Sequence, residues 1–122
     1  MDRDSCLNAA PQLIGTENQI EWAERIRRRV NEEFDRVGAT FHAVTARQDA
    51  EAKADTLNII AILEDKRTEV MRQEQADYFI HDWQEITDQV RQMIFHDERH
   101  SAIRKRQDLR RSHPPSSEHE SN

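Results

Sequence analysis

The chain has 122 residues, of which 35% are hydrophobic and 34% charged, so it can bury one modest core in a single small domain. Two glycines and three prolines are too few for many short strands joined by tight turns, and no apolar run is long enough to cross a membrane. The composition therefore excludes all-β folds and integral membrane proteins, and it predicts a helical protein.

Acidic and basic residues are distributed unevenly along the chain. Residues 49–98 carry a net charge of -8 and residues 99–111 carry +5, within a total of -6. This asymmetry favours either packing of one segment on the other or a local site for an anionic partner. Cys6 is the single cysteine, so we expect no intrachain disulfide, no multi-cysteine metal site and a reducing, cytoplasmic location. The first residues do not have the pattern of a secretion signal.

The first predicted elements are an irregular arm over residues 1–15, which we expect to dock on the helices, and a long helix behind it. Thr16 to Gln19 have the form of a capping box, so a helix is predicted to begin there. Apolar residues then recur at spacings of three and four and form one stripe on a helix face: Ala23, Ile26, Val30, Phe34, Val37, Phe41 and Val44. Gly38 is predicted either to end this helix or to loosen it.

Two more helices are predicted in the rest of the chain. Residues 49–56 lack large side chains and are predicted to be either a solvated helical turn or the corner between two helices, with a corner nearby favoured. The apolar residues from Leu57 onward predict a second helix, and the next break is predicted at 72–75. A third apolar stripe predicts a helix through Phe79, Trp83, Ile86, Val90 and Met93. No glycine or proline lies between Gly38 and Pro114, so helix is predicted to extend through the basic stretch to about residue 111. Residues 112–122 contain no apolar side chain and are predicted to be a disordered tail.

The fold class that these stripes predict is all-α, with one helical domain over residues 16–111. Stripes of several turns at 3/4 spacing fit an elongated antiparallel helical hairpin or a three-helix bundle with coiled-coil-like packing. Such a bundle buries little surface per chain, so we expect a homo-oligomer, most simply a dimer. Trp22 and Trp83 lie beside or within apolar stripes and are both predicted to be core residues, whereas an exposed Trp would mark a partner interface.

Two residue pairs near the end of the third helix suggest alternative chemistry. His96 and His100 are four residues apart, the spacing of metal-binding helices, although a third ligand would have to come from elsewhere. Arg91 and His96 satisfy a loose Arg-x4–6-His pattern and so resemble the HEPN ribonucleases, which are small and all-α. That resemblance implies that Arg91 orients a scissile phosphate and that His96 handles the proton of a 2′-hydroxyl. Gln92 departs from the small polar or acidic residue usual in that family.

The leading interpretation assigns no catalytic residue, no metal and no cofactor, and places binding on charged segments instead. The nucleic-acid-binding candidates are Arg99, Arg104, Lys105, Arg106, Arg110 and Arg111. They have no interleaved aromatic residues for stacking on bases, so we favour pairing of this cluster with the acidic segment 49–98, in the same chain or in a second copy. The partner-binding candidates in that acidic segment are Glu64, Asp65, Glu69, Glu74 and Asp77.

One segment of the chain resembles a known group of proteins. Residues 13–27 read Leu-Ile-Gly-Thr-Glu-Asn-Gln-Ile-Glu-Trp-Ala-Glu-Arg-Ile-Arg. This is similar to a Leu-x-Gly-Ser/Thr-x-x-Gln-Ile-x-Trp-Ala-Glu-x-Ile-Arg segment of uncharacterised small helical proteins of bacterial mobile elements. Residues 78–82 resemble a diverged form of an aromatic-Ile-Asp end in the same group. The resemblance implies a compact helical hairpin and a phage, plasmid or genomic-island setting, and it carries over no catalytic residue.

Three functional hypotheses follow from the sequence. The first is a non-enzymatic helical module that binds another protein, such as an accessory or anti-defence inhibitor protein of a phage or mobile element. The alternative is a nucleic-acid binder or HEPN-like ribonuclease that uses Arg91, His96 and the basic helix over 99–111. The third is a metal-binding regulator that uses His96 and His100. None of the three involves a membrane.

Overall fold

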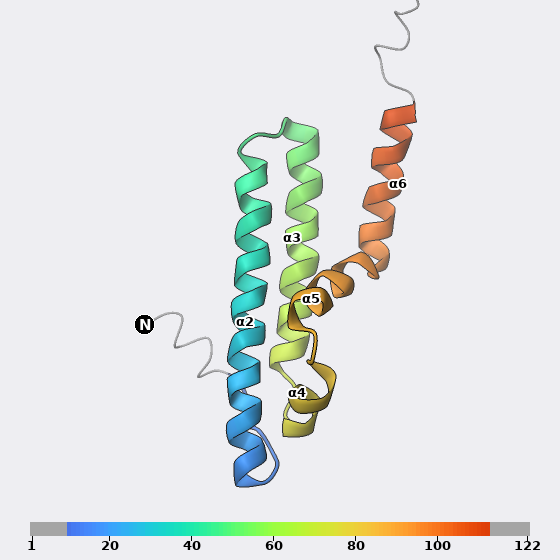
Figure 1. The fold of residues 1–122 in the computed structure, drawn as a ribbon. Helices are drawn as coiled ribbons and strands as arrows, with labels where there is room; N and C mark the ends of the chain where they lie inside the picture. The colour runs from blue at the N-terminus through green and yellow to red at the C-terminus, as the bar shows by residue number, and fades with distance from the viewer. Residues whose placement is uncertain (1–9, 113–122) are drawn as a thin grey trace, which may run out of the picture.

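The computed structural model describes residues 10–112, and within them the chain forms five α-helices (Figure 1). They are α2 (Glu17–Thr45), α3 (Ala50–Met71), α4 (Ala76–Asp82), α5 (Ile86–Phe95) and α6 (Glu98–Ser112). Helices α2 and α3 form a long antiparallel hairpin, α4 and α5 pack against it, and α6 lies along α3 (Figure 1). The predicted all-α class is confirmed, with five helices where the sequence predicted two or three.

The predicted start of the first helix is confirmed. The Gln19 backbone N–H donates to the Thr16 hydroxyl at 3.2 Å, and the Gln19 side chain accepts from the Thr16 backbone N–H at 2.9 Å, which completes a capping box. Gly38 does not end the helix, which continues to Thr45. Gly38 faces α3, where a Cβ atom in its place would lie 3.3 Å from Leu63 Cδ2.

The N-terminal arm docks where the structure describes it, from residue 10 to Gly15. Leu13 is buried, and Ile14 forms a short parallel backbone bridge with Gln75, just before α4. The Ile14 N–H donates to the Glu74 carbonyl at 2.7 Å, and the Ile14 carbonyl accepts from the Ala76 N–H at 2.9 Å. The remaining part of the predicted arm, residues 1–9, and the predicted tail beyond Ser112 lie outside the described residues.

Two predicted connections are in place. The corner between α2 and α3 lies at residues 46–49, where the Asp49 carboxylate caps α3 by accepting from the Ala52 N–H at 2.9 Å. Residues 50–56 are the first turns of α3, which therefore begins seven residues before the predicted Leu57. The break predicted at residues 72–75 separates α3 from α4. Both connections follow from local signals, a capping side chain in one case and a run of polar residues in the other.

The prediction of one continuous third helix is wrong, because the chain leaves the helical conformation at Trp83 and Glu85. The Gln89 side chain supports this break: its amide donates to the Asp82 carbonyl, and its oxygen accepts from the Glu85 N–H at 2.8 Å. The indole of Trp83 turns inward, with its ring centroid 6.3 Å from that of Phe34. Burial of this large ring offsets the loss of helical hydrogen bonds.

A second break, at residues 96–97, makes the basic stretch a separate helix and so corrects the prediction of an uninterrupted run to residue 111. The Asp97 carboxylate accepts from the Arg99 backbone N–H at 2.8 Å at the start of α6. This contact satisfies a donor that the first turn of a helix leaves free. The chain thereby changes direction, and α6 runs beside α3 instead of continuing the line of α5 (Figure 1).

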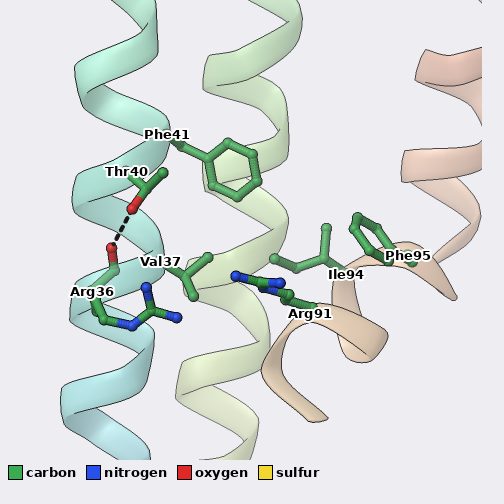
Figure 2. A pocket seen from close by; sticks show the side chains of 7 residues that line it. All are labelled: Arg36, Val37, Thr40, Phe41, Arg91, Ile94 and Phe95. Atoms are coloured by element: carbon green, nitrogen blue, oxygen red, sulfur yellow. Dashed lines mark hydrogen bonds between the residues drawn. The ribbon is translucent and has the colours of Figure 1, made fainter. Parts of the chain in front are cut away.

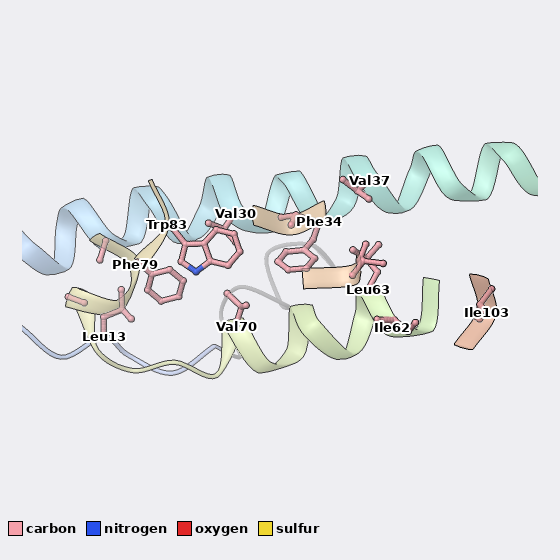
Figure 3. Packing of buried hydrophobic residues seen from close by; sticks show 14 residues of the cluster. Leu13, Val30, Phe34, Val37, Ile62, Leu63, Val70, Phe79, Trp83 and Ile103 are labelled. Carbon is pink, nitrogen blue, oxygen red and sulfur yellow. The ribbon is translucent and has the colours of Figure 1, made fainter. Parts of the chain in front are cut away.

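The core lies between α2, α3, α4 and α5 and extends from Leu13 to Ile103 on α6 (Figure 3). Phe34, Leu63 and Phe79 are fully buried within it. Most of the predicted apolar positions of α2 belong to this cluster or pack against it. Val44 and Leu57, by contrast, are exposed.

Candidate binding surface

An open cleft, which we call the Trp22 cleft, lies between α2 and the connection from α4 to α5. Its volume is about 590 Å³, and its walls are Trp22, Ile26, Arg29, Ile80, Trp83, Gln84, Glu85, Ile86, Thr87 and Asp88. Trp22 is 53% exposed, so the prediction that it is a core residue is wrong, whereas Trp83 is confirmed as buried. The small side chain of Ala23, fully buried, takes the core position at this turn of α2 and leaves the neighbouring indole outside.

A second hollow, which we call the arginine hollow, lies further along α2, between α2 and α5. It has a volume of about 240 Å³ and is lined by Arg36, Val37, Thr40 and Phe41 of α2 and by Arg91, Ile94 and Phe95 of α5 (Figure 2). Figure 2 shows the guanidinium groups of Arg36 and Arg91 reaching into the space beside Val37. The hollow thus combines an apolar floor with two cations at its mouth.

The two hollows open on the same side of α2. Trp22, Arg29 and Arg36 follow at intervals of seven residues, and such positions drift by only about 20° per interval on an α-helix. The interval from Trp22 to Arg36 corresponds to about 21 Å along the helix axis, at about 1.5 Å per residue. Ile26 and Val37 lie deeper on the same side and line the floors. This side of α2, together with α5, forms an elongated surface with a ring at one end and two cations at the other.

The structure does not bring Arg91 and His96 to one site. Arg91 lines the arginine hollow, whereas His96 lines a separate pocket of about 230 Å³ together with Tyr78 and Met93. A ribonuclease of the kind that the Arg-x4–6-His pattern suggested needs both side chains at one phosphate. Positions five residues apart on a helix lie about 140° apart around its axis, so the two side chains are on different faces.

His96 and His100 also lie in different environments. His96 is exposed, and His100 is buried with its ring 5.1 Å from the ring of Phe95. Burial lowers the pKa of His100, and the positive charge of Arg104 lowers it further. Across residues 10–112 no three His, Cys, Asp or Glu side chains are grouped so that they could hold a metal ion. The predicted alternative metal site therefore has no third ligand in the described part of the chain.

The basic residues of α6 pack on the acidic residues of α3, as the favoured interpretation predicted. Arg99 binds Asp65 at 2.6 Å, while Arg106 lies 3.2 Å from Asp55. Arg110 forms an ion pair with Asp55 and lies 3.3 Å from Glu51. These contacts engage three of the predicted nucleic-acid-binding residues within the chain itself.

The remaining members of that basic set are on the outer side of α6. Arg111 lies 3.6 Å from Asp108 in its own helix. Arg104 and Lys105 are exposed, and neither has an ion pair with any carboxylate of residues 10–112. Two unpaired cations on one turn are a small patch compared with the several phosphate contacts of nonspecific nucleic-acid binding.

The five acidic partner-binding candidates are all exposed, but the fold spreads them over three elements. Glu64, Asp65 and Glu69 lie on α3, Glu74 lies in the connection to α4, and Asp77 lies on α4. Glu64, Asp65 and Glu69 are paired with Arg67, Arg99 and Lys66, at 3.4, 2.6 and 4.0 Å respectively, and Asp77 lies 3.8 Å from His81. No single acidic face results.

The most distinctive surface residues were missed at the sequence level. Trp22 was assigned to the core, and Arg36 was not singled out. The sequence does contain a signal for this surface: Trp22, Arg29 and Arg36 are seven residues apart and so lie on one side of the helix, next to the apolar stripe. Phe95, which is 47% exposed, flanks the third apolar stripe and gave no comparable signal.

A search of protein-family models, curated proteins and solved structures finds no match to this chain. Within residues 10–112, none of the helices has both the length and the apolar character that a membrane crossing requires. The surface is therefore interpreted from its own geometry.

Proposed function

We propose that this protein is a non-enzymatic protein-interaction module that grips its partner through the Trp22 cleft. The observation that carries the proposal is the indole of Trp22, 53% exposed on the rim of a cleft of about 590 Å³. Tryptophan is among the residues most enriched at the energetic centres of protein interfaces, and burial of a half-exposed ring supplies a large part of a binding free energy.

The walls of the cleft support a polypeptide partner. Ile26, Ile80 and Ile86 are half-buried and leave apolar surface at the base of the cleft. Arg29 stands on the α2 wall, and Asp88 stands on the opposite wall. Protein–protein interfaces usually have an apolar centre and a rim of polar and charged groups, and this cleft has both.

The acidic residues that the sequence favoured have weaker support as the main contact. Asp65 and Glu69 are held by cations of the chain itself, and the five candidates are divided among three elements. We therefore propose the Trp22 cleft, and not the acidic segment, as the main contact with the partner. A mobile-element setting, with a role as an accessory or inhibitor protein, is supported by the resemblance of residues 13–27, and a cytoplasmic location by the single cysteine.

Affinity purification of the tagged full chain from its native host, with and without nuclease, tests this proposal. We expect a stoichiometric protein partner that survives nuclease, is lost with Trp22→Ala and is retained with Leu109→Ala. Leu109 is the matched control, because it is an apolar side chain that is 63% exposed on α6, away from the cleft. Circular dichroism checks that both variants keep the wild-type helix content.

Two results would contradict the proposal. One is a partner that binds Trp22→Ala as well as it binds the wild type. The other is RNA or DNA as the only co-purifying molecule, lost when Arg104 and Arg106 are replaced by Ala, which supports the nucleic-acid alternative. The homodimer that the sequence predicts is a separate question, answered by sedimentation velocity over a range of concentrations; a monomer throughout contradicts it.

A further inference from the structure

The arginine hollow contains two cations, of which Arg36 is paired with Glu33 and Arg91 has no partner among residues 10–112. Arg36 and Arg91 come from different helices, and both line one hollow of about 240 Å³. Glu33 compensates the charge of Arg36, whereas no carboxylate of residues 10–112 compensates that of Arg91, and an anion in the hollow supplies the missing negative charge. Figure 2 shows both groups beside Val37, which places them over the floor of the hollow.

The two arginines are held differently. The Arg36 Nε donates to Glu33 at 3.0 Å, and a second nitrogen of the same group also contacts Glu33, which fixes its direction and leaves Nη1 without a partner among residues 10–112. Arg91 has no hydrogen bond or ion pair with any residue in that range. By contrast, Arg99 and Arg110 are each bound by two carboxylates. The hollow thus presents one oriented cation and one that is available.

The floor of the hollow determines what kind of anion fits. Val37 and Ile94 are buried, Phe41 is half-buried, and Phe95 is 47% exposed, so the surface below the arginines is apolar. The Thr40 hydroxyl already donates to the Arg36 backbone carbonyl at 3.0 Å. The ligand must therefore place an apolar group on the floor and its charge at the mouth.

A phosphate-bearing nucleotide fits this arrangement poorly. Recognition of a base uses hydrogen bonds to its edges, and beyond the two guanidinium groups the lining offers only the occupied Thr40 hydroxyl. The volume of about 240 Å³ is also below the range of about 300–1,000 Å³ that drug-sized ligands fill. A carboxylate, in contrast, matches the planar fork of a guanidinium and needs no further polar contact.

We propose that the arginine hollow binds a carboxylate joined to a compact apolar group, with Arg91 and Arg36 on the carboxylate and the apolar group over Val37 and Ile94. This chemistry has two sources, a free apolar acid and the C-terminal end of a polypeptide whose last side chain is apolar. The proposal does not depend on the Trp22 cleft, because the two hollows share no lining residue.

Titration of the full chain with 4-phenylbutyrate, followed by the methyl signals of Val37 and Ile94 in NMR spectra, tests the proposal. We expect saturable shifts of both methyl groups and an affinity about tenfold or more above that of the neutral analogue 4-phenylbutanamide, because the charge-assisted hydrogen bonds are lost in the amide. Equal affinity for the acid and the amide overturns the proposal.

Matched variants show whether the arginines are responsible. Arg91→Gln is expected to weaken 4-phenylbutyrate binding about tenfold, while binding of the amide stays unchanged. Arg28→Gln is the control, because Arg28 is exposed on α2 and lines neither hollow. Equal weakening by both variants, or tighter binding of AMP than of 4-phenylbutyrate, overturns the proposal.

Short peptides that end in leucine distinguish the two sources of the carboxylate. A peptide with a free C-terminus that binds more tightly than 4-phenylbutyrate, and loses this affinity when it is amidated, identifies a polypeptide end as the ligand. Tighter binding of 4-phenylbutyrate than of the free peptide identifies a small apolar acid. Both results support the proposed chemistry, and failure of both ligands to shift the Val37 and Ile94 signals refutes it.

Discussion

The middle of the molecule and the α6 region are stabilised by different forces. In the middle, Phe34, Phe79 and Val90 are fully buried from three different helices, so apolar burial dominates. At α6, Ile103 is buried, at 3% exposure, and Arg99, Arg106 and Arg110 form ion pairs with carboxylates of α3. Apolar burial is not directional and responds little to salt, whereas ion pairs with exposed cations are weakened by salt and by acid. The comparison implies one robust unit and one helix that detaches easily.

The largest expected effect comes from the middle of the molecule. Phe34→Ala should lower the free energy of unfolding by about 3–5 kcal/mol, because it removes a fully buried ring and leaves a cavity beside Trp83. Urea denaturation followed by circular dichroism measures this loss. If Phe34→Ala lowers the free energy of unfolding by less than about 1 kcal/mol, apolar burial does not stabilise the middle of the molecule more than ion pairs stabilise α6.

The second effect isolates the ion pairs of α6. Asp55 is 4% exposed and accepts from Arg106, Gln107 and Arg110. Asp55→Ala should destabilise the α6 contact by about 1–2 kcal/mol, less than a fully buried pair because both arginines are partly exposed. Amide hydrogen exchange should speed up in α6 and remain slow in α2.

A matched variant serves as the control for this prediction. Asp65→Ala removes an exposed ion pair with the same helix, through Arg99, and should cost only about 0–1 kcal/mol. If the two variants have equal effects, burial of Asp55 adds nothing to the contact. If exchange accelerates equally in α2 and α6, the two regions unfold together.

The third effect is a pH dependence confined to α6. Hydrogen bonds from Arg99 hold the pKa of Asp97 well below its usual value. Burial alone would raise the pKa of Asp55, but hydrogen bonds from Arg110 and Arg106 outweigh it and leave that pKa lowered as well. Because both carboxyls have a lower pKa in the folded state, their stabilisation is complete above about pH 4, the value for an unfolded Asp, and is lost as the pH falls further.

NMR spectra recorded from pH 7 to pH 2 check this dependence. The signals of α6 should change before those of α2, and Asp55→Asn should remove part of the change. High salt at pH 7 should act in the same direction, because the screening length falls to about 3 Å at 1 M ionic strength. Simultaneous loss of α2 and α6 signals on acidification contradicts the distinction.

The smallest effects come from the two glycines, which test packing on a finer scale. Gly38→Ala should stabilise the protein by about 0.5 kcal/mol, since Gly costs about 1 kcal/mol in a helix and the added methyl group needs only a slight movement of Leu63. Gly15→Ala should destabilise it, because a Cβ there would lie 3.1 Å from Ala76 Cβ and 3.0 Å from Gln19 Oε1. Thermal melts of the two variants should shift in opposite directions, and shifts of the same sign contradict this account.

The parts of the fold that the sequence predicted depend on local signals. The capping box at Thr16, the corner near Asp49 and the break at residues 72–75 each involve a few neighbouring residues, and the structure has all three. The apolar stripe of α2 was visible because a long helix repeats its pattern over many turns.

The parts that the sequence did not predict depend on contacts between distant residues. The break at Trp83 has no glycine or proline, and it follows from the fit of the indole against Phe34 and from the side-chain contacts of Gln89. Ala23 is fully buried at the turn of α2 where Trp22 is 53% exposed, and which of the two neighbours is covered depends on how the other helices meet α2. The arginine hollow joins residues 36 and 91, and no local pattern could pair them.

The backbone bridge between Ile14 and Gln75 has a topological consequence. It joins the start of α2 to the end of α3 and so closes the hairpin into a ring. A cut in the corner at residues 46–49 opens the ring at one point, and the bridge and the α2–α3 packing still hold the two pieces together. The first piece then carries α2, and the second carries α3, α4, α5 and α6. We therefore expect a chain that is cut in this corner to stay in one piece, because α2 remains joined to the rest by the bridge and by its packing on α3, α4 and α5.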